Sequence, residues 1–160
     1  MSITVNTLVP ADAMAYTHDT FTVTVASQTE PQRMDSTSVT TGVTAVRGAQ
    51  LSPSFAKQFA APGSWVTYTL RLTNTGNVTQ GYALGLFSDR PAMLNPYSTT
   101  LPAGQEQDVQ VAVFLPPFLL ENATAYVLAW YETFTGTLAS YAQLEALVAA
   151  YRLYCPLILP

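Results

Sequence analysis

The chain of 160 residues is predicted to be all-β, and two observations lead to this prediction. Only 10% of the residues are charged while 49% are hydrophobic, and threonine, serine and valine are abundant. This composition suits pleated strands with hydroxyl-bearing outer faces better than helices with charged outer faces. In addition, apolar and polar residues alternate along several short stretches, which clusters of Pro, Gly, Asn and Ser separate.

The clearest strand is expected at 64–74, followed by the turn signal Asn74-Thr-Gly-Asn77. A period of two places apolar side chains on one face of this strand, which is therefore expected to be half-buried. The apolar positions are Val66, Tyr68, Leu70 and Leu72, and they alternate with Trp65, Thr67, Thr69, Arg71 and Thr73.

Three strands are expected in residues 1–44, at 3–9, 20–27 and 36–44. The second of them places Phe21, Val23 and Val25 on one face and threonines on the other. Three strands in so short a segment indicate a fragment of a sheet rather than a complete domain.

An internal repeat explains why this fragment is incomplete. Each of its strands matches a later stretch, and the first match ends in proline at both places. The matched pairs are 3–10 with 109–116, 20–26 with 125–131, and 38–43 with 143–148. Residues 1–44 are therefore interpreted as the last three strands of an incomplete unit, residues 45–155 as the complete unit, and residues 156–160 as a C-terminal tail.

Seven strands are expected in the complete unit, with an irregular stretch at 89–100. They lie at 44–51, 55–61, 64–74, 80–88, 107–115, 125–132 and 143–151. The last of them has a competing interpretation, because Tyr141, Leu144, Val148 and Tyr151 are spaced as on a helix. The repeat favours the strand, because the matching segment 38–43 is rich in residues that disfavour helices.

About seven short strands with regular turn signals are typical of an immunoglobulin-like β-sandwich. The stretch Val66–Asn77, the segment from Leu101-Pro-Ala-Gly104 to Val113, and Pro116-Pro117 resemble bacterial Ig-like domains of the CARDB and NPCBM-associated type. The resemblance covers about 46–150. It implies domains that stand in tandem in large secreted or cell-surface proteins and are generally not catalytic. The ending 151–160 is similar to the tails of some large secreted bacterial proteins, so Pro160 is expected to be the true C-terminus.

Several function classes are disfavoured by the sequence. The net charge of −4, with Lys57 and five arginines, leaves no basic patch for a nucleic acid. No apolar run reaches the ~20 residues that cross a bilayer, and the Met1 end lacks a secretory signal. Cys155 is the sole cysteine, so no disulfide forms within one chain, although pairing between chains stays open. Without a phosphate-binding loop or nucleophile motif, we expect neither an enzyme nor a cofactor.

The polar candidates for a site are few. His18 beside Asp19 is expected in a surface loop, without further ligands for a metal. Asp89 with Asn95, or Glu106 with Asp108, could share a cation at a sandwich end, and the alternative is that they are solvated loop side chains. No metal site is therefore predicted.

Two further candidates concern carbohydrate. Aromatic residues could form a stacking platform for glycans, although Tyr68, Tyr126 and Trp130 are expected in the core. The aromatic candidates are Trp65, Tyr68, Tyr82, Phe87, Tyr97, Tyr126, Trp130, Tyr131 and Phe134. Asn77 and Asn122 also begin N-x-T sequences that accept N-linked sugar in some organisms.

The incomplete unit supplies the main functional hypothesis. A sheet of two or three strands is marginal in water, so its apolar face and edges need a cover. Either preceding strands of a longer chain or another copy could provide it. The predicted function is a non-catalytic extracellular or cell-surface module that assembles by β-strand pairing in a filament or stalk. The alternative is a C-terminal spacer or glycan-binding region of a secreted hydrolase. The predicted assembly face comprises Val5, Val9, Phe21, Val23 and Val25.

Overall fold

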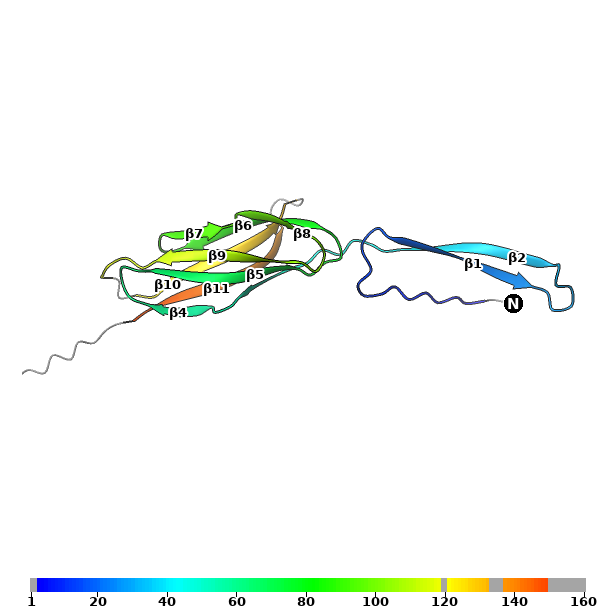
Figure 1. The fold of residues 1–160 in the computed structure, drawn as a ribbon, viewed down its shortest axis with the longest axis horizontal. Helices are drawn as coiled ribbons and strands as arrows, with labels where there is room; N and C mark the ends of the chain where they lie inside the picture. Colours follow the sequence, from blue (N-terminus) through cyan, green and yellow to red (C-terminus); the bar gives the residue numbers. More distant parts are fainter. Residues whose placement is uncertain (1–2, 119–120, 133–136, 150–160) are drawn as a thin grey trace, which may run out of the picture.

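The computed structural model describes residues 3–118, 121–132 and 137–149, and this part of the chain contains strands but no helix. Strands β1 (His18–Ala26) and β2 (Met34–Gly42) form a separate two-stranded sheet. The remaining strands form a sandwich, and the hairpin extends from one end of it (Figure 1). The described part of the chain is therefore long and narrow.

The sandwich consists of a four-stranded sheet in the order β3-β5-β9-β7 and a five-stranded sheet in the order β4-β11-β10-β6-β8. All neighbouring strands are antiparallel except β4 and β11, which are parallel. The strands are β3 (Ala49–Pro53), β4 (Lys57–Ala60), β5 (Trp65–Asn74), β6 (Gln80–Ser88), β7 (Ala92–Asn95), β8 (Ser98–Leu101), β9 (Glu106–Phe114), β10 (Ala123–Tyr131) and β11 (Leu138–Val148).

This order is that of the immunoglobulin fold. There the first, second, fifth and fourth strands form one sheet, and the third, sixth and seventh form the other. Counting β3, β5, β6, β7, β9, β10 and β11 as the seven strands reproduces both observed sheets, with β4 and β8 as additional edge strands. The predicted Ig-like β-sandwich is thus confirmed.

One detail of the predicted sandwich requires correction, and one alternative that the sequence left open is decided. Residues 89–100 are not irregular, because they contain β7 in one sheet and β8 in the other. Each of these strands has only four residues, too few to show a convincing alternation. The strand favoured at 143–151 is confirmed as far as Val148, where β11 ends, so the helix alternative is wrong there; Tyr151 lies outside the described residues. β11 pairs with β10 on one side and β4 on the other, and these pairings override its helical composition.

The core lies between the two sheets and follows the predicted alternation of β5 and β9. Every second side chain of these strands is buried, namely Val66, Tyr68, Leu70, Leu72, Val109, Val111 and Val113. The expectation that Tyr126 and Trp130 fill the core is wrong, because β10 directs its smaller residues inward. Those inward residues are Ala123, Ala125, Val127 and Ala129. β10 is apolar on both faces, so alternation alone does not identify the inner one, and the core already holds Tyr68 and Tyr82.

The expected strand at 3–9 is also corrected, because these residues have no ladder partner within the described chain. They run beside the hairpin (Figure 1) and contact it through side chains, such as Thr7 Oγ1 and Thr41 Oγ1 at 3.5 Å. Alternation predicts which side chains share a face, but a strand also needs a neighbouring edge that offers backbone hydrogen bonds. The strands expected at 20–27 and 36–44 correspond to β1 and β2, each within two residues.

Asn74 connects the two turns that carried the resemblance to bacterial Ig-like domains. Its buried side-chain Nδ2 donates to the carbonyl oxygens of Val78 (2.8 Å) and Leu101 (2.9 Å), and its Oδ1 accepts from the Gly76 amide (3.0 Å). Its carbonyl accepts from the amide of Gly104, whose φ of 71° favours glycine. Asn74 thereby joins the turn after β5 to the turn before β9.

We expect Asn74→Ala to lower the free energy of unfolding by about 2–3 kcal/mol, because it leaves buried carbonyl groups without donors. Asn122→Ala is the matched control, since Asn122 is exposed and makes one hydrogen bond, from the Val148 amide. Urea unfolding followed by tryptophan fluorescence measures both variants. Equal losses in the two variants would contradict a linking role for Asn74.

The two fully buried tyrosines differ in their hydrogen bonding. The Tyr82 hydroxyl donates to the carbonyl oxygen of Gly48 at 2.8 Å, whereas the Tyr68 hydroxyl has no partner within the described chain. Burial raises the pKa of both phenols from 10 to about 12, with smaller contributions from Glu145 at Tyr68 and Tyr131 at Tyr82. As the pH rises, these phenols lose their protons at a lower pH in the unfolded chain than in the folded one. Their contribution to the free energy of unfolding is therefore fully present below pH 10 and is lost as the pH rises towards 12.

We expect Tyr68→Phe to be neutral or slightly stabilising at pH 7, because it removes an unpaired buried hydroxyl. Tyr82→Phe removes a hydrogen bond and is expected to cost about 1 kcal/mol. Both variants should lose less stability than the parent chain between pH 10 and 12. Unfolding curves at pH 7, 10 and 11 test this, and a large loss for Tyr68→Phe at pH 7 would contradict it.

Candidate interaction site

The hairpin of β1 and β2 has one apolar face and one hydroxyl face. Cross-strand pairs on the apolar face include Phe21 with Val39 and Val23 with Thr37. On the opposite face, the hydroxyl of Thr20 lies 2.9 Å from that of Thr40, and Thr22 Oγ1 lies 3.3 Å from Ser38 Oγ. The hydroxyl face satisfies its own polar groups, while the apolar face is left without a covering sheet.

An apolar groove of about 540 Å³ lies on this hairpin. Its lining comes from the N-terminal segment and from both strands, and consists of Ile3, Val5, Val23, Val25, Asp35, Ser36, Thr37 and Val39. Val5 and Val25 remain 46% and 47% exposed. We call this set of residues the hairpin groove.

The predicted assembly face is gathered only in part. Val5, Val23 and Val25 all line the hairpin groove, whereas Val9 lines a separate hollow of about 160 Å³ near Pro10 and Val43. Phe21 is half-buried on the apolar face of β1 but is not part of the groove lining. The sequence reasoning missed Ile3 and Val39, although Val39 is the apolar residue nearest the middle of its threonine-rich strand.

The edges of the hairpin are its second unusual feature. β1 and β2 have nine residues each and pair only with each other among the described residues. By contrast, the edge strands of the sandwich, β3, β4, β7 and β8, have four or five residues. Short edge strands limit association, whereas long unpaired edges favour the addition of another strand.

In the sandwich, β10 and β11 form a similar hairpin whose two edges are paired and whose inner face is covered. β10 pairs with β6, β11 pairs with β4, and the four-stranded sheet covers the inner face. The predicted alignment sets Phe21 over Tyr126, which lies on the outer face. The strand pairings suggest a different alignment. Phe21 pairs with Val39 in the first hairpin, and Ala125 pairs with Leu144 in the second. If Val39 is aligned with Leu144, Phe21 is therefore aligned with Ala125. With this shift of one residue, the apolar hairpin face corresponds to a core-facing surface.

Asn77 joins the hairpin unit, which is residues 3–44, to the sandwich. Its Nδ2 donates to the carbonyl oxygens of Ala13 (3.3 Å) and Thr44 (3.0 Å), and its Oδ1 accepts from the Val46 amide (2.7 Å). Its backbone carbonyl accepts from the Ala15 amide and its amide donates to Val46. Nothing in the sequence except the turn signal indicated this role, because the partners lie more than thirty residues away.

The polar candidates do not come together as a site. His18 does not lie in a loop but begins β1, and the described residues contain no group of three or more His, Cys, Asp or Glu side chains able to hold a metal. Asp89 accepts a hydrogen bond from the Thr124 amide (3.0 Å), whereas Asn95 pairs with Gln110 in the other sheet.

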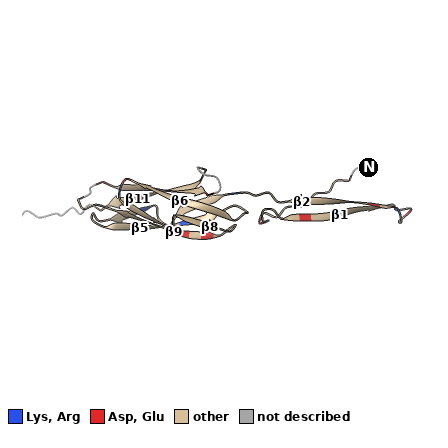
Figure 2. Ribbon diagram, turned by 90° about the horizontal axis from the view of Figure 1, so that it is seen from above, with Lys and Arg blue, Asp and Glu red and all other residues tan. Residues whose placement is uncertain are grey.

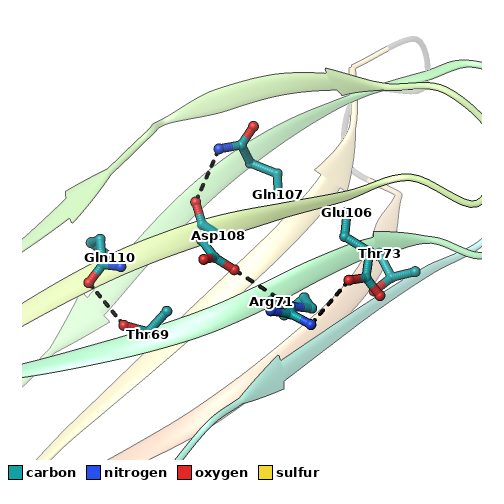
Figure 3. Close-up of polar contacts among 7 residues, drawn as sticks. All are labelled: Thr69, Arg71, Thr73, Glu106, Gln107, Asp108 and Gln110. Atoms are coloured by element: carbon teal, nitrogen blue, oxygen red, sulfur yellow. Dashed lines mark hydrogen bonds and ion pairs between the residues drawn. The ribbon is translucent and has the colours of Figure 1, made fainter.

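Glu106 and Asp108 are bridged by an arginine. Arg71 Nη1 lies 3.2 Å from Glu106 Oε2, and Arg71 Nε lies 3.6 Å from Asp108 Oδ1, on the outer face of β5 and β9 (Figure 3). Figure 2 shows that charged residues are sparse along both units. The positive charge that Glu106 and Asp108 share is therefore the guanidinium of Arg71.

Aromatic residues form an exposed surface on the five-stranded sheet. Phe87, Tyr126, Leu128 and Tyr141 surround a shallow hollow of about 270 Å³, and Tyr141 is 65% exposed. Trp130 lies over Gly85 of the same sheet, where no Cβ obstructs its ring. We call Phe87, Tyr126, Leu128 and Tyr141 the aromatic surface.

The other aromatic candidates are dispersed. Trp65 packs on Phe114 with ring centroids 5.2 Å apart on the four-stranded sheet, and Tyr97 is exposed near β8. Tyr131 is half-buried against the core, with its ring centroid 5.9 Å from that of Tyr82. Phe134 lies outside the described residues, as do Cys155 and the tail 156–160. The described residues also include no helix long and apolar enough to pass through a membrane.

No protein-family model and no curated protein matches this chain. Similar solved structures include PapD-like domain 7 of human CEP192, with 13% identity over 63% of this chain and 84% of that chain, at a TM-score of 0.44. WR4, an MSP family member of C. elegans, has 10% identity over 62% of this chain and 97% of that chain (TM-score 0.43). Domains 4 and 5 of the S-layer protein SbsC have 16% identity over 90% of this chain and 82% of that chain (TM-score 0.43). The CARDB and NPCBM resemblance therefore stays a prediction.

We expect Asn77→Ala to loosen the joint between the hairpin unit and the sandwich without unfolding either, because the lost bonds to Ala13 and Thr44 cross that joint and the lost bond from Val46 holds the chain next to it. Hydrogen exchange should accelerate at the amides of Ala15 and Val46 by about tenfold and stay unchanged in β9. Asn95→Ala, on an edge strand away from the joint, is the control. Unchanged exchange at Ala15 and Val46 would contradict this role.

Proposed function

We propose that this chain is a non-catalytic structural module of the cell surface or extracellular space that associates with other polypeptides through its N-terminal hairpin. The single observation that carries this proposal is the hairpin itself. Among the residues that the structure describes, it combines two nine-residue edges without a further partner strand and an apolar face without a covering sheet.

Physical chemistry supports association at this place rather than elsewhere. An isolated two-stranded sheet is marginal in water, and an open edge presents unpaired amide and carbonyl groups to an incoming strand. The corresponding hairpin of the sandwich, β10 and β11, has a strand on each side and a sheet against its face. We infer that residues 1–44 form an incomplete unit that a second polypeptide completes.

The position of the hairpin favours a filament or stalk. It lies at one end of a long molecule (Figure 1), where a contact with the opposite end of the next copy would be head-to-tail. Such head-to-tail contacts produce open chains of copies unless the rotation between them closes a ring. The extracellular setting rests on the resemblance of the two turn motifs to bacterial surface domains.

The alternative function is a spacer or glycan-binding region of a secreted hydrolase, and the aromatic surface favours it. Exposed rings on a sheet offer flat apolar area on which sugar rings stack. The surface contains no charged residue, in keeping with a neutral ligand. Retention on insoluble polysaccharide that Tyr141→Ala abolishes and Tyr97→Ala preserves would favour this alternative.

We expect the chain to associate in a concentration-dependent manner, and Val23→Asp to weaken association at least tenfold by placing a charge in the hairpin groove. Thr22→Asp is the matched control, because Thr22 lies on the hydroxyl face of the same strand. Light scattering across a dilution series measures both variants. A monomer whose β1 and β2 amides exchange slowly would contradict the proposal, because such a hairpin needs no partner.

A further inference from the structure

We propose that the hairpin groove binds the C-terminal segment 151–159 of a second copy of this chain, which adds along the hairpin as a donated strand. This inference rests on the proposed function and specifies the partner. It combines three observations: the apolar groove, the composition of the segment, and the opposite positions of hairpin and C-terminal end in the fold.

The groove is suited to an extended apolar peptide. Five of its lining residues are aliphatic, namely Ile3, Val5, Val23, Val25 and Val39. The groove lies over the apolar face of the hairpin, and among the described residues the outer edges of β1 and β2 are unpaired. A peptide that pairs with one of these nine-residue edges can direct every second side chain towards that face. Its one charged residue, Asp35, lies on the β2 side, opposite Val25 in the pairing register.

The segment has matching chemistry and length. Residues 151–159 read Tyr-Arg-Leu-Tyr-Cys-Pro-Leu-Ile-Leu, with no charged residue after Arg152. Nine extended residues span about 30 Å, which equals the length of β1. Pro156 lacks an amide hydrogen, so this segment suits the outer strand of a sheet better than a central one. Arg152 offers a positive charge of the kind that Asp35 attracts.

The fold keeps this segment away from the hairpin of its own copy. β11 begins at the joint end of the sandwich, where Leu138 pairs with Trp130, and runs to Val148 at the far end. Figure 1 shows this end of β11 opposite the hairpin. The eleven residues of β11 cover about 36 Å, and the seven steps along β1 from His18 to Val25 add about 23 Å.

This separation identifies the occupant as a second copy. From Ala149 the remaining eleven residues reach at most about 40 Å when fully extended. This is less than the roughly 59 Å to Val25 of the same chain, and less than the roughly 46 Å to Val39, which pairs with Phe21 three steps from His18. A neighbouring copy in line has no such restriction. The same contact can repeat at each end, so successive donation builds a linear assembly.

The test compares the full chain with a chain that ends at Ala149, which keeps every described strand. The full chain carries Cys155→Ser, so that no intermolecular disulfide contributes to its association. Sedimentation velocity across a concentration series measures association. We expect the full chain to assemble and the shortened chain to associate at least tenfold more weakly. A full-length variant with Leu157→Asp and Leu159→Asp should behave as the shortened chain does, which separates loss of the segment from misfolding.

A synthetic peptide of residues 150–160 gives an independent readout. Added to the shortened chain, it should slow hydrogen exchange in β1 and β2 at least tenfold and leave β9 unchanged, whereas a scrambled peptide should do neither. Val23→Asp in the shortened chain should abolish this protection.

The outcomes separate the two proposals. If the shortened chain associates as the full chain does while Val23→Asp still blocks association, the hairpin function stands and segment donation is overturned. Donation would likewise be overturned if Tyr141→Lys lost association while the shortened chain and the Leu157→Asp, Leu159→Asp variant kept it. That result would mean that the aromatic surface of a second copy occupies the groove. If neither association nor peptide protection occurs, both proposals fail.

Discussion

Backbone amide and carbonyl groups along the edge of a strand must find partners, and this requirement organises the whole chain. The sandwich meets it by making its edge strands only four or five residues long and its central strands nine to eleven. The hairpin of β1 and β2 does not meet it within the described chain, since both of its edges are long and open. The same physical rule therefore separates the sandwich, whose long strands are paired, from the hairpin, whose long edges are unpaired among the described residues.

Two asparagines in one turn have separate connecting roles, one within the sandwich and one between the two units. Asn74 faces the core and ties the turn after β5 to the turn before β9, while Asn77 faces the hairpin unit and ties it to the sandwich. An asparagine side chain both donates and accepts, so one residue satisfies backbone groups of opposite kinds. Through Asn77, this turn of the sandwich holds the base of the hairpin unit at Ala13 and Thr44.

The two exposed apolar surfaces of the molecule differ in chemistry. The hairpin groove is aliphatic and borders open strand edges, which suits an extended peptide that also forms backbone hydrogen bonds. The aromatic surface lies on a sheet whose strands are already paired, so it offers side-chain contact alone. This difference is why strand donation is assigned to the hairpin and stacking to the sheet.

The sequence by itself determined the strands with clear alternation and the inward residues of β5 and β9, because a period of two is a local property. It also located Val5, Val23 and Val25 of the groove. The repeat favoured a strand over a helix at β11, and the pairings of β11 confirmed the strand. Only the tertiary structure decided that β10 turns Tyr126 and Trp130 outward and that residues 3–9 lack a ladder partner among the described residues. These features depend on neighbours distant in sequence: which strands flank β11, how Tyr68 and Tyr82 fill the core, and which edges stay open.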